Sequence, residues 1–476
     1  MTGKQFILAL FGTFFFLNLS AQTVWSLEKC IDHAAQNSLT LKQADYAIQD
    51  AQLREKSAKN QRLPGVSGSV SGGLQFGRTI DPTTNSFNNQ TIGFNSFRVD
   101  ASATLYNGGR IANTIKQSQI DTEAARLDAE ASFDFIALSI ANTYLSILNA
   151  EEQLKNAQIR LESSQRQLER TDKLIAAGTL PKNDRLDVLA QIARDEQAIV
   201  QSQNAIEANY LNLKQLLELD PNADIKIELP DLNRVSAQAD IDHLTFREVY
   251  AAAIGTQPQV KASQLREKST LLNVDLARAG MLPTLVLFAG IDTRWSSASK
   301  KVIGTTDAVS EQEVFINNMP VNVGFPTTIP IFGDNPYFDQ IDQNFGQSVG
   351  VQLSIPIYSR GQNKIAMERA QIGVLNARVQ TEQTLNTLKT DVQTAIANAR
   401  AAKLSLEAAE KTFEAAKAAY DNAQSKYELG AISTFDLTTA KNNLDIAERD
   451  AVTAKYEYIF RLKVIDYYEG KPLKLN

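Results

Sequence analysis

The chain has 476 residues, of which 43% are hydrophobic and 21% charged, and its net charge is −6. This apolar content excludes a wholly disordered chain, and the acidic balance excludes the basic surface that nucleic-acid binding requires. One cysteine and two histidines exclude an internal disulfide and a CxxC metal site, and they leave few groups for catalysis. We therefore expect no enzyme, no metal site, no cofactor and no nucleic-acid partner.

The first residues have the pattern of an export signal. A basic residue, Lys4, precedes an apolar run at 6–17, and small residues end the segment at Ala21. The run is too short to span a bilayer, which takes about 20 residues. We expect residues 1–21 to be a signal peptide and the mature chain to be exported without a transmembrane helix. A soluble secreted protein and a β-barrel protein of an outer membrane remain as alternatives.

Short motifs recur along the chain at fixed offsets. Leu63-Pro64 returns 219 residues later as Leu282-Pro283, and the motif around Gly178 returns 252 residues later around Gly430. A longer loop in the second half accounts for the difference between the two offsets. These repeats predict a tandem duplication. The first repeat spans 26–220, the linker 221–244, the second repeat 245–469 and a C-terminal tail 470–476.

Apolar residues recur every seven positions from Phe133 to Ile175, and the same spacing returns 252 residues later from Leu385 to Tyr427. Sustained heptads predict helices packed as coiled coils. Residues 110–177 contain no glycine or proline, and 362–429 contain only Gly373, so each segment predicts one rod of roughly 100 Å. Four shorter helices are expected at 26–61, 183–219, 245–280 and 434–468. Gly255 and Pro258 should kink or break the third of these.

Four runs of about ten residues alternate apolar and polar side chains, with clear alternation in the second and fourth. These strands are expected at about 65–77, 96–107, 284–295 and 348–358. Their length suits tilted membrane-spanning strands, but four strands cannot close a barrel, and open edges in lipid leave backbone groups unpaired. The pattern therefore predicts an oligomer. Between the last two strands, apolar pieces in the long loop 296–347 predict ordered packing.

The order of these features resembles TolC-type outer-membrane efflux proteins. The resemblance is carried by Leu-Pro before each first strand, Tyr-x-x-Gly after each second strand, and glycine followed six residues later by aspartate at each helical tip. It covers essentially the whole mature chain. It implies an α+β membrane protein in which long coiled-coil helices form an α-helical barrel, the periplasmic tunnel. Four β-strands per chain would contribute to a trimeric, 12-stranded outer-membrane β-barrel.

The resemblance also implies a function. The protein would be a homotrimer in the cell outer membrane, in contact with its lipid and with a large periplasmic portion. It would serve as the passive exit duct of a tripartite efflux system, energised by an inner-membrane transporter through a periplasmic adaptor (membrane fusion) protein. Two alternatives stay open: the outer-membrane component of a type I protein secretion system, and a secreted coiled-coil rod or binding protein without a pore. Alternating strands beside long helices argue against the rod.

In the family, the helical tips form the periplasmic mouth and contact the adaptor. Here the tips are Gly178, Thr179 and Leu180 in the first half and Gly430, Ala431 and Ile432 in the second. Glycine at such positions also suits a plain helix-ending turn, because it readily adopts the left-handed backbone conformation. Both interpretations of the tips remain.

Asp184 and Asp436 each follow a tip glycine by six residues. The resemblance implies a latch between Asp184 and Tyr427 and an acidic constriction at Asp436. The alternatives are a polar residue favoured in a first helical turn and, for Tyr427, a place in the helical core. Two positions depart from the family pattern. Ile432 stands where an arginine is expected, and Thr439 where a second constriction aspartate is expected, so we expect a gate of Asp436 and Thr439 with one acidic ring.

Overall fold

The computed structural model describes residues 24–80, 87–89, 91–229, 241, 243–316 and 318–473. The expected signal peptide (1–21) and much of the expected linker lie outside these ranges. The chain divides into two compact units. The first comprises Met1–Ala51, Asp121–Glu267 and Asn376–Asn476, and the second comprises Gln52–Ile120 and Lys268–Leu375.

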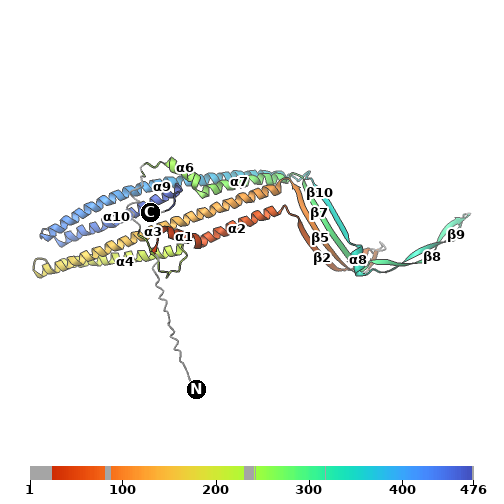
Figure 1. The fold of residues 1–476 in the computed structure, drawn as a ribbon, viewed down its shortest axis with the longest axis horizontal. Coiled ribbons are helices and arrows are strands. Elements are labelled where there is room, and N and C mark those ends of the chain that lie inside the picture. The colour runs from red at the N-terminus through yellow and green to blue at the C-terminus, as the bar shows by residue number, and fades with distance from the viewer. Residues whose placement is uncertain are drawn as a thin grey trace, which may run out of the picture. The chain divides into compact units, whose positions relative to one another are not determined.

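Two long helices dominate the described chain, and each is followed by a return helix (Figure 1). Helix α3 (Arg110–Ala176) and helix α9 (Gln362–Glu428) have 67 residues each, which is a length of roughly 100 Å. Helix α4 (Asp184–Leu216) and helix α10 (Thr434–Tyr468) run back from the two tips. The two long helices begin 252 residues apart, as the repeated motifs predict.

The core of the first unit follows the heptads of the sequence. Ile140 and Ile147 of α3 are fully buried and pack in one cluster with Leu213 of α4 and Ile459 of α10. The small side chain of Ala157 is also fully buried, and small seam residues let helices approach closely. Apolar side chains at seven-residue spacing therefore hold helices of both halves together.

Among the described helices, α3 alone is long and apolar enough to cross a membrane by length and composition. One such helix is weak evidence for a membrane span. Its apolar residues Ile136, Ala141 and Leu148 lie in the core cluster. We therefore interpret this stretch as a buried core segment of a long helix.

The first helix of each half is broken at equivalent positions. Helices α1 (Leu27–Asn37) and α2 (Leu39–Asn60) meet at Ser38, and α6 (Phe246–Thr256) and α7 (Pro258–Ala279) meet at Gln257. These two residues are 219 positions apart, which is the offset of the Leu-Pro repeat. The break before Pro258 was expected, because the residue before a proline avoids the helical conformation.

The break at Ser38 corrects the expectation of one helix over 26–61. Ser38 is buried and extended, and its hydroxyl oxygen accepts a hydrogen bond from the Leu41 N–H at 3.5 Å. A serine in this arrangement caps the start of the following helix. The first half therefore has the same helix break as the second half, although no proline follows Ser38.

The second unit contains one antiparallel sheet in the order β10-β7-β5-β2. Its strands are β2 (Gly65–Gln75), β5 (Ile92–Asn107), β7 (Thr284–Ser296) and β10 (Gly346–Ser354). All four expected strands are present, although β10 ends at Ser354, four residues earlier than expected. Strands β2 and β10 form the two edges of the sheet within the described part of the chain.

The expected long loop 296–347 contains regular structure that the sequence analysis missed. Strands β8 (Lys300–Ile316) and β9 (Met319–Asp334) pair as an antiparallel hairpin, and helix α8 (Tyr337–Gln343) follows. Gln340 of α8 is fully buried and accepts a hydrogen bond from the Ser296 N–H at 3.0 Å. Figure 1 shows the hairpin extending beyond the end of the sheet where α8 lies.

Two short pairings complete the described strands. Strands β3 (Arg78–Ile80) and β4 (Phe87–Asn89), which lie between β2 and β5 in the chain, pair with each other. Strand β1 (Val24–Trp25) lies parallel to β6 (Lys226–Ile227), and this pairing ties the start of the described chain to the segment after α4.

Candidate functional site

The first helical tip ends in a defined backbone motif. The Gly178 N–H donates to the Ile175 carbonyl and the Thr179 N–H donates to the Leu174 carbonyl, each at 3.0 Å. Gly178 has a φ of 73°, which lies in the left-handed region that glycine tolerates. This pair of hydrogen bonds is the Schellman motif, which ends a helix by satisfying its last carbonyls.

The second tip repeats the motif. The Gly430 N–H donates to the Tyr427 carbonyl at 3.0 Å, and the Ala431 N–H donates to the Lys426 carbonyl at 2.9 Å. Gly430 has a φ of 70°. Both glycines therefore end helices, which confirms the interpretation of each tip as a helix-ending turn. Contact of the tips with an adaptor stays a prediction.

Four helices contribute one side chain each to a polar cluster beside the tips, which we call the tip cluster. It consists of Thr171 (α3), Asp184 (α4), Tyr427 (α9) and Thr434 (α10). The Thr434 hydroxyl lies 2.8 Å from Asp184 Oδ2 and 3.2 Å from the Tyr427 hydroxyl. The Tyr427 hydroxyl lies 3.5 Å from that of Thr171. Three of the four side chains are buried, and Asp184 is half-buried.

The tip cluster brings Asp184 and Tyr427 together through Thr434. A carboxylate only accepts, so the single proton of the Thr434 hydroxyl is donated to Asp184. In the contact between the two hydroxyl groups, Tyr427 is then the donor and Thr434 the acceptor. Sequence analysis named Asp184 and Tyr427 but missed Thr434, which connects them. A threonine at the start of a helix resembles an ordinary surface residue.

Asp436 belongs to the cap of α10. Its backbone N–H donates to the Ser433 hydroxyl at 3.2 Å, and its Oδ2 accepts from the Ser433 N–H at 3.1 Å. This reciprocal pair is a capping box. The side chain is exposed, as is Thr439, whose hydroxyl donates to the Phe435 carbonyl of its own helix at 2.9 Å. The helix-start role of Asp436 is thus present, and its role in a constriction stays a prediction.

An ion pair joins the two long helices near the tip cluster. Arg170 of α3 lies 2.8 Å from Glu428 of α9, and this guanidinium holds the pKa of Glu428 below its ordinary value. Both side chains are more than one-third exposed. An exposed ion pair of this kind contributes little to stability, because water screens its charges.

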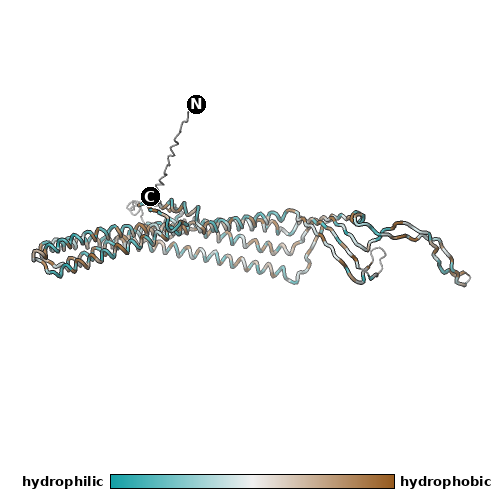
Figure 2. The backbone as a smooth tube through the Cα atoms, turned by 90° about the horizontal axis from the view of Figure 1, so that it is seen from below, coloured by the Kyte–Doolittle hydropathy of each residue, from teal (hydrophilic) through white to brown (hydrophobic). Residues whose placement is uncertain are grey.

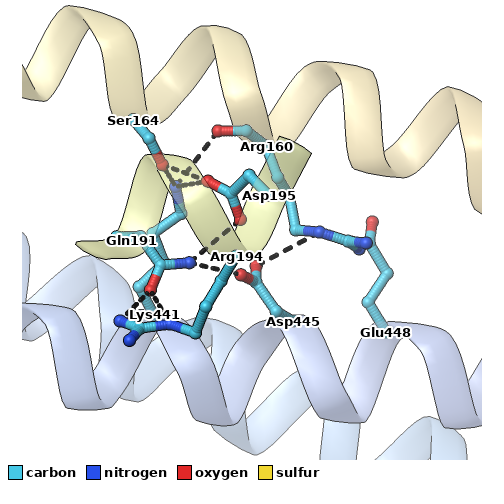
Figure 3. A network of polar contacts seen from close by, with 8 residues as sticks. All are labelled: Arg160, Ser164, Gln191, Arg194, Asp195, Lys441, Asp445 and Glu448. Carbon is cyan, nitrogen blue, oxygen red and sulfur yellow. Dashed lines mark hydrogen bonds and ion pairs between the residues drawn. The ribbon is translucent and has the colours of Figure 1, made fainter. Parts of the chain in front are cut away.

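A second polar group lies further along the helices, where α3, α4 and α10 meet (Figure 3). We call it the buried network. Asp195 of α4 is its centre, because it accepts hydrogen bonds from Ser164 and from Gln191 Nε2, the latter at 2.9 Å, and pairs with Lys441 at 3.5 Å. Lys441 also donates to Ser164. The network therefore ties the return helix of the second half to both helices of the first.

The buried network balances its charges. Arg160 lies 3.1 Å from Glu448 and 3.8 Å from Asp445, and Gln191 Nε2 donates to Asp445 at 3.4 Å. Arg194 donates to the Gln191 side-chain oxygen at 2.7 Å. Three cationic and three anionic side chains thus share one region; Arg194 is exposed, and pairing limits the cost of burying the others.

The surroundings of Asp445 in the buried network shift its pKa. Burial raises its pKa to about 7, although Arg160 and Lys441 act in the opposite direction and Asp195 and Glu448 add to the rise. Its side chain is mostly buried. The carboxyl therefore changes its charge near neutral pH.

Sequence analysis missed the buried network, although a signal for it exists. Asp195 lies three residues after Ile192, and Lys441 lies three residues before Leu444. Asp195 thus occupies the second apolar position of its heptad, whereas Lys441 stands at a position that flanks the seam. A charge at such a position is costly unless a partner is present, so the two seams together could have indicated a pair.

The two faces of the sheet differ in chemistry. The register places Val99 beside Ile291 and Ala101 beside both Val66 and Ala289, so these apolar side chains share one face. Apart from the apolar Phe94, Val286 and Phe288, the opposite face carries polar side chains, which the register aligns across all four strands. They are Ser67, Ser69, Ser71, Arg98, Asp100, Ser102, Asp292, Arg294, Ser348 and Gln352. One apolar and one polar face is the pattern of a membrane strand sheet whose other side faces water.

Comparison with known proteins identifies the family. The pattern of the family described as outer membrane efflux protein matches residues 30–218 and 334–462, which is more than half of the chain. The chain belongs to the outer membrane efflux protein family. No curated protein matches it.

Solved structures of outer-membrane channels share the fold of this efflux protein. CusC is 16% identical, with a TM-score of 0.75 over 94% of this chain and 92% of CusC. The CmeC outer membrane channel of Campylobacter jejuni is 17% identical, with a TM-score of 0.71 over 93% of this chain and 85% of CmeC. The MtrE outer membrane channel of Neisseria gonorrhoeae, in its open state, is 18% identical, with a TM-score of 0.70 over 94% of this chain and 90% of MtrE.

Family and fold together confirm several predictions. The fold is that of outer-membrane efflux channels, with long tunnel helices joined to membrane strands. The protein is an efflux channel of the outer membrane with a large periplasmic portion, and it is not an enzyme. The alternative of a secreted rod without a pore is therefore wrong.

The tip cluster generates the first prediction. Thr434→Val keeps the side-chain shape but removes the hydroxyl that joins Asp184 to Tyr427. Hydrogen bonds to charged groups contribute about 1.5–3 kcal/mol, so we expect the four helices to separate more easily and the channel to leak. The measurements are single-channel conductance and uptake of large antibiotics. Thr412→Val is the matched control, because the exposed Thr412 hydroxyl donates to the Ala408 carbonyl of its own helix, at 2.9 Å. Equal conductance in both variants would show that the cluster does not restrain opening.

The raised pKa of Asp445 generates the second prediction. In the unfolded chain this carboxyl loses its proton near its ordinary pKa of about 3.9, while the folded protein keeps it up to about pH 7. Asp445 therefore adds stability as pH falls from 7 toward 4 and loses that contribution as pH rises through 7. Asp445→Asn should weaken this part of the pH dependence, measured as melting temperature between pH 5 and pH 8. Asp450→Asn, at an exposed position on the same helix, is the control. An unchanged profile in Asp445→Asn would contradict the assignment.

Proposed function

We propose that this efflux channel acts as a homotrimer, as the passive exit duct of a tripartite efflux system. In such a system an inner-membrane transporter supplies the energy and a periplasmic adaptor (membrane fusion) protein joins the transporter to the duct. The observation that carries the trimer is the four-stranded sheet with open edges and an apolar face. The family and the tips support the adaptor.

The open edges of the sheet call for further copies. Strands β2 and β10 each pair with one neighbour in the described chain, so each presents a row of free backbone groups. Within lipid every such group costs several kcal/mol unless it is paired. Pairing β10 of one copy with β2 of the next removes both edges, and three copies of four strands give the 12-stranded barrel of the family. The apolar face then contacts outer-membrane lipid and the polar face lines the pore.

The helical tips suit a helical partner. Besides the tip residues Gly178, Thr179, Leu180, Gly430, Ala431 and Ile432, large apolar side chains lie exposed beside both turns. Leu186, Leu429 and Phe435 are 62%, 84% and 67% exposed. Exposed apolar groups of this size favour a protein contact. We therefore assign this surface to the adaptor.

The gate of the duct would combine two elements. The tip cluster, with Asp184 and Tyr427 joined through Thr434, would hold the two hairpins of one copy together as a latch. Asp436 and Thr439 of three copies would face one another at the mouth. One carboxylate oxygen of Asp436, Oδ2, accepts hydrogen bonds from Ser433 in the helix cap. The other oxygen, Oδ1, would then face the threefold axis of the trimer.

The trimer has a direct test. The protein should fractionate with the outer membrane, need detergent for extraction, and run as three copies by native mass before heating in SDS. Recovery of a single copy from the soluble periplasmic fraction would contradict the proposed assembly.

The constriction at Asp436 has its own test. Three carboxylates about 7 Å apart repel by about 0.6 kcal/mol per pair in a water-like dielectric, so a cation should be favoured between them. We expect the wild type to prefer cations and to be blocked by trivalent ions from the periplasmic side in planar bilayers. Asp436→Asn should lose both properties and keep its cap, because an amide oxygen can still accept from Ser433.

Asp421→Asn is the matched control for that experiment, because Asp421 is an exposed carboxylate on α9. It should leave both selectivity and block as in the wild type. If Asp436→Asn keeps its selectivity and its block, Asp436 serves only the helix cap.

A further inference from the structure

The β8–β9 hairpin is a long ribbon that lies outside the two segments matched by the family pattern, except at its last residue. With 17 residues in β8 its length is roughly 55 Å. It connects β7 to β10, and it pairs along its whole length from Lys300–Asp334 to Ile316–Met319. An isolated two-stranded hairpin is at best marginally stable in water, so such a ribbon needs a packing partner.

The register sorts the side chains of the hairpin into two different faces. Cross-strand partners point to the same face, and all three charged residues between 302 and 332, Asp307, Glu311 and Glu313, fall on one of them. We call this the acidic face. The opposite, uncharged face is formed by alternate residues of both strands. Its members are Thr306, Ala308, Ser310, Gln312, Val314, Val321, Val323, Phe325, Thr327 and Ile329.

Apolar groups of the uncharged face are open to solvent within the single chain. Phe325, Ile329 and Val321 are 45%, 50% and 42% exposed. Figure 2 shows that both hydrophobic and hydrophilic positions lie along this ribbon. Because one face combines apolar side chains with a complete lack of charge, it suits burial, whereas the acidic face suits water.

Edge-to-edge pairing is not available for closing a ring of such hairpins. Pro320, Pro326 and Pro330 lie an even number of residues apart on β9, so their missing N–H groups belong to one edge of the strand. Since β9 stays paired with β8 along its other edge, the prolines block the free edge. A ring would need the β9 edge of one copy on the β8 edge of the next, so packing must use the faces instead.

The uncharged face is complementary to itself in shape. The β8 side carries the small residues Thr306, Ala308 and Ser310 opposite the large Ile329 and Phe325 of β9. The large β9 side of one copy can therefore pack on the small β8 side of the next. Such a contact joins two different patches, and it closes into a ring when the rotation between copies is one-third of a turn.

We propose that the three hairpins of the trimer pack through their uncharged faces around the common axis, on the outer side of the channel, with their acidic faces toward water. This inference rests on the proposed trimer, which sets β10 of one copy beside β2 of the next and so brings the hairpins that precede β10 together. Two-stranded ribbons coil strongly, so the three would wrap around one another. The channel would then carry a proteinaceous cap or collar at its outer mouth.

A photo-crosslinking amino acid tests which surface covers the uncharged face. Phe325→p-benzoyl-phenylalanine places the probe on the uncharged face, and Phe315→p-benzoyl-phenylalanine places it on the acidic face as a matched control. After irradiation of whole cells, denaturing gels should show bands at two and three times the monomer mass for the probe at 325. The probe at 315 should give the monomer alone. A second probe, Ile329→p-benzoyl-phenylalanine, should repeat the result at 325.

Each other outcome overturns the inference and says where it fails. Adducts of the 325 probe with lipopolysaccharide alone would assign the face to the outer leaflet, and equal adducts at 325 and 315 would remove the distinction between the faces. The native mass of each detergent-extracted variant is measured first. A trimer without crosslinked copies would reject the hairpin packing alone, whereas a single copy would reject the proposed trimer and the hairpin packing together.

Discussion

A helix of 67 residues with an apolar seam has to be covered along its length, and this constraint shapes the whole channel. No single partner of ordinary size can cover α3 or α9, so each half of the chain supplies several shorter helices. In the described first unit, Leu27 and Ala34 of α1 and Leu213 of α4 all join the core cluster of α3. The same demand explains the break at Ser38 and at Gln257, since a broken helix can change direction while it follows its partner.

Polar residues enter this seam only where they meet partners from other helices. Asp195, Lys441 and Ser164 are buried, and each would be costly alone, because a buried charge without a partner loses its hydration. Together they satisfy one another, yet an apolar set of equal volume could be as stable. The buried network therefore selects one alignment of α10 along α3 and α4, because its hydrogen bonds form only in that alignment. The tip cluster repeats this arrangement with hydroxyl groups and one carboxylate.

Sequence patterns could predict the parts of the fold that depend on periodicity. The heptads and the lack of proline predicted the long helices to within one residue, and the single Gly373 does not interrupt α9. Alternation found β5 and β10, and the Leu-Pro motif found the starts of β2 and β7. The β8–β9 hairpin was not predicted, because prolines such as Pro320, Pro326 and Pro330 usually argue against a strand. They are tolerated here on a free edge, which only the three-dimensional pairing defines.

Side-chain partners between distant segments were harder to predict than elements. Asp184 and Tyr427 were named from a resemblance, but their connection through Thr434 depends on how α10 begins. Ser38 likewise required knowing that a buried serine caps a second helix within the predicted one. Such contacts depend on how four helices pack together, and no local sequence pattern predicts that packing.

The two tips show how one substitution separates the roles of repeated residues. Asp184 and Asp436 both follow a tip glycine by six residues, but the residue three before each differs. Ser433 provides a hydroxyl and an N–H for the capping box with Asp436, whereas its counterpart Pro181 has neither. Helix α4 therefore begins two residues later than α10 does relative to the glycine. Freed from a cap, the Asp184 carboxylate accepts the hydroxyl proton of Thr434 on the opposite hairpin. The two equivalent aspartates therefore differ in role: Asp436 caps its helix beside Ser433, and Asp184, which follows Pro181, links the two halves.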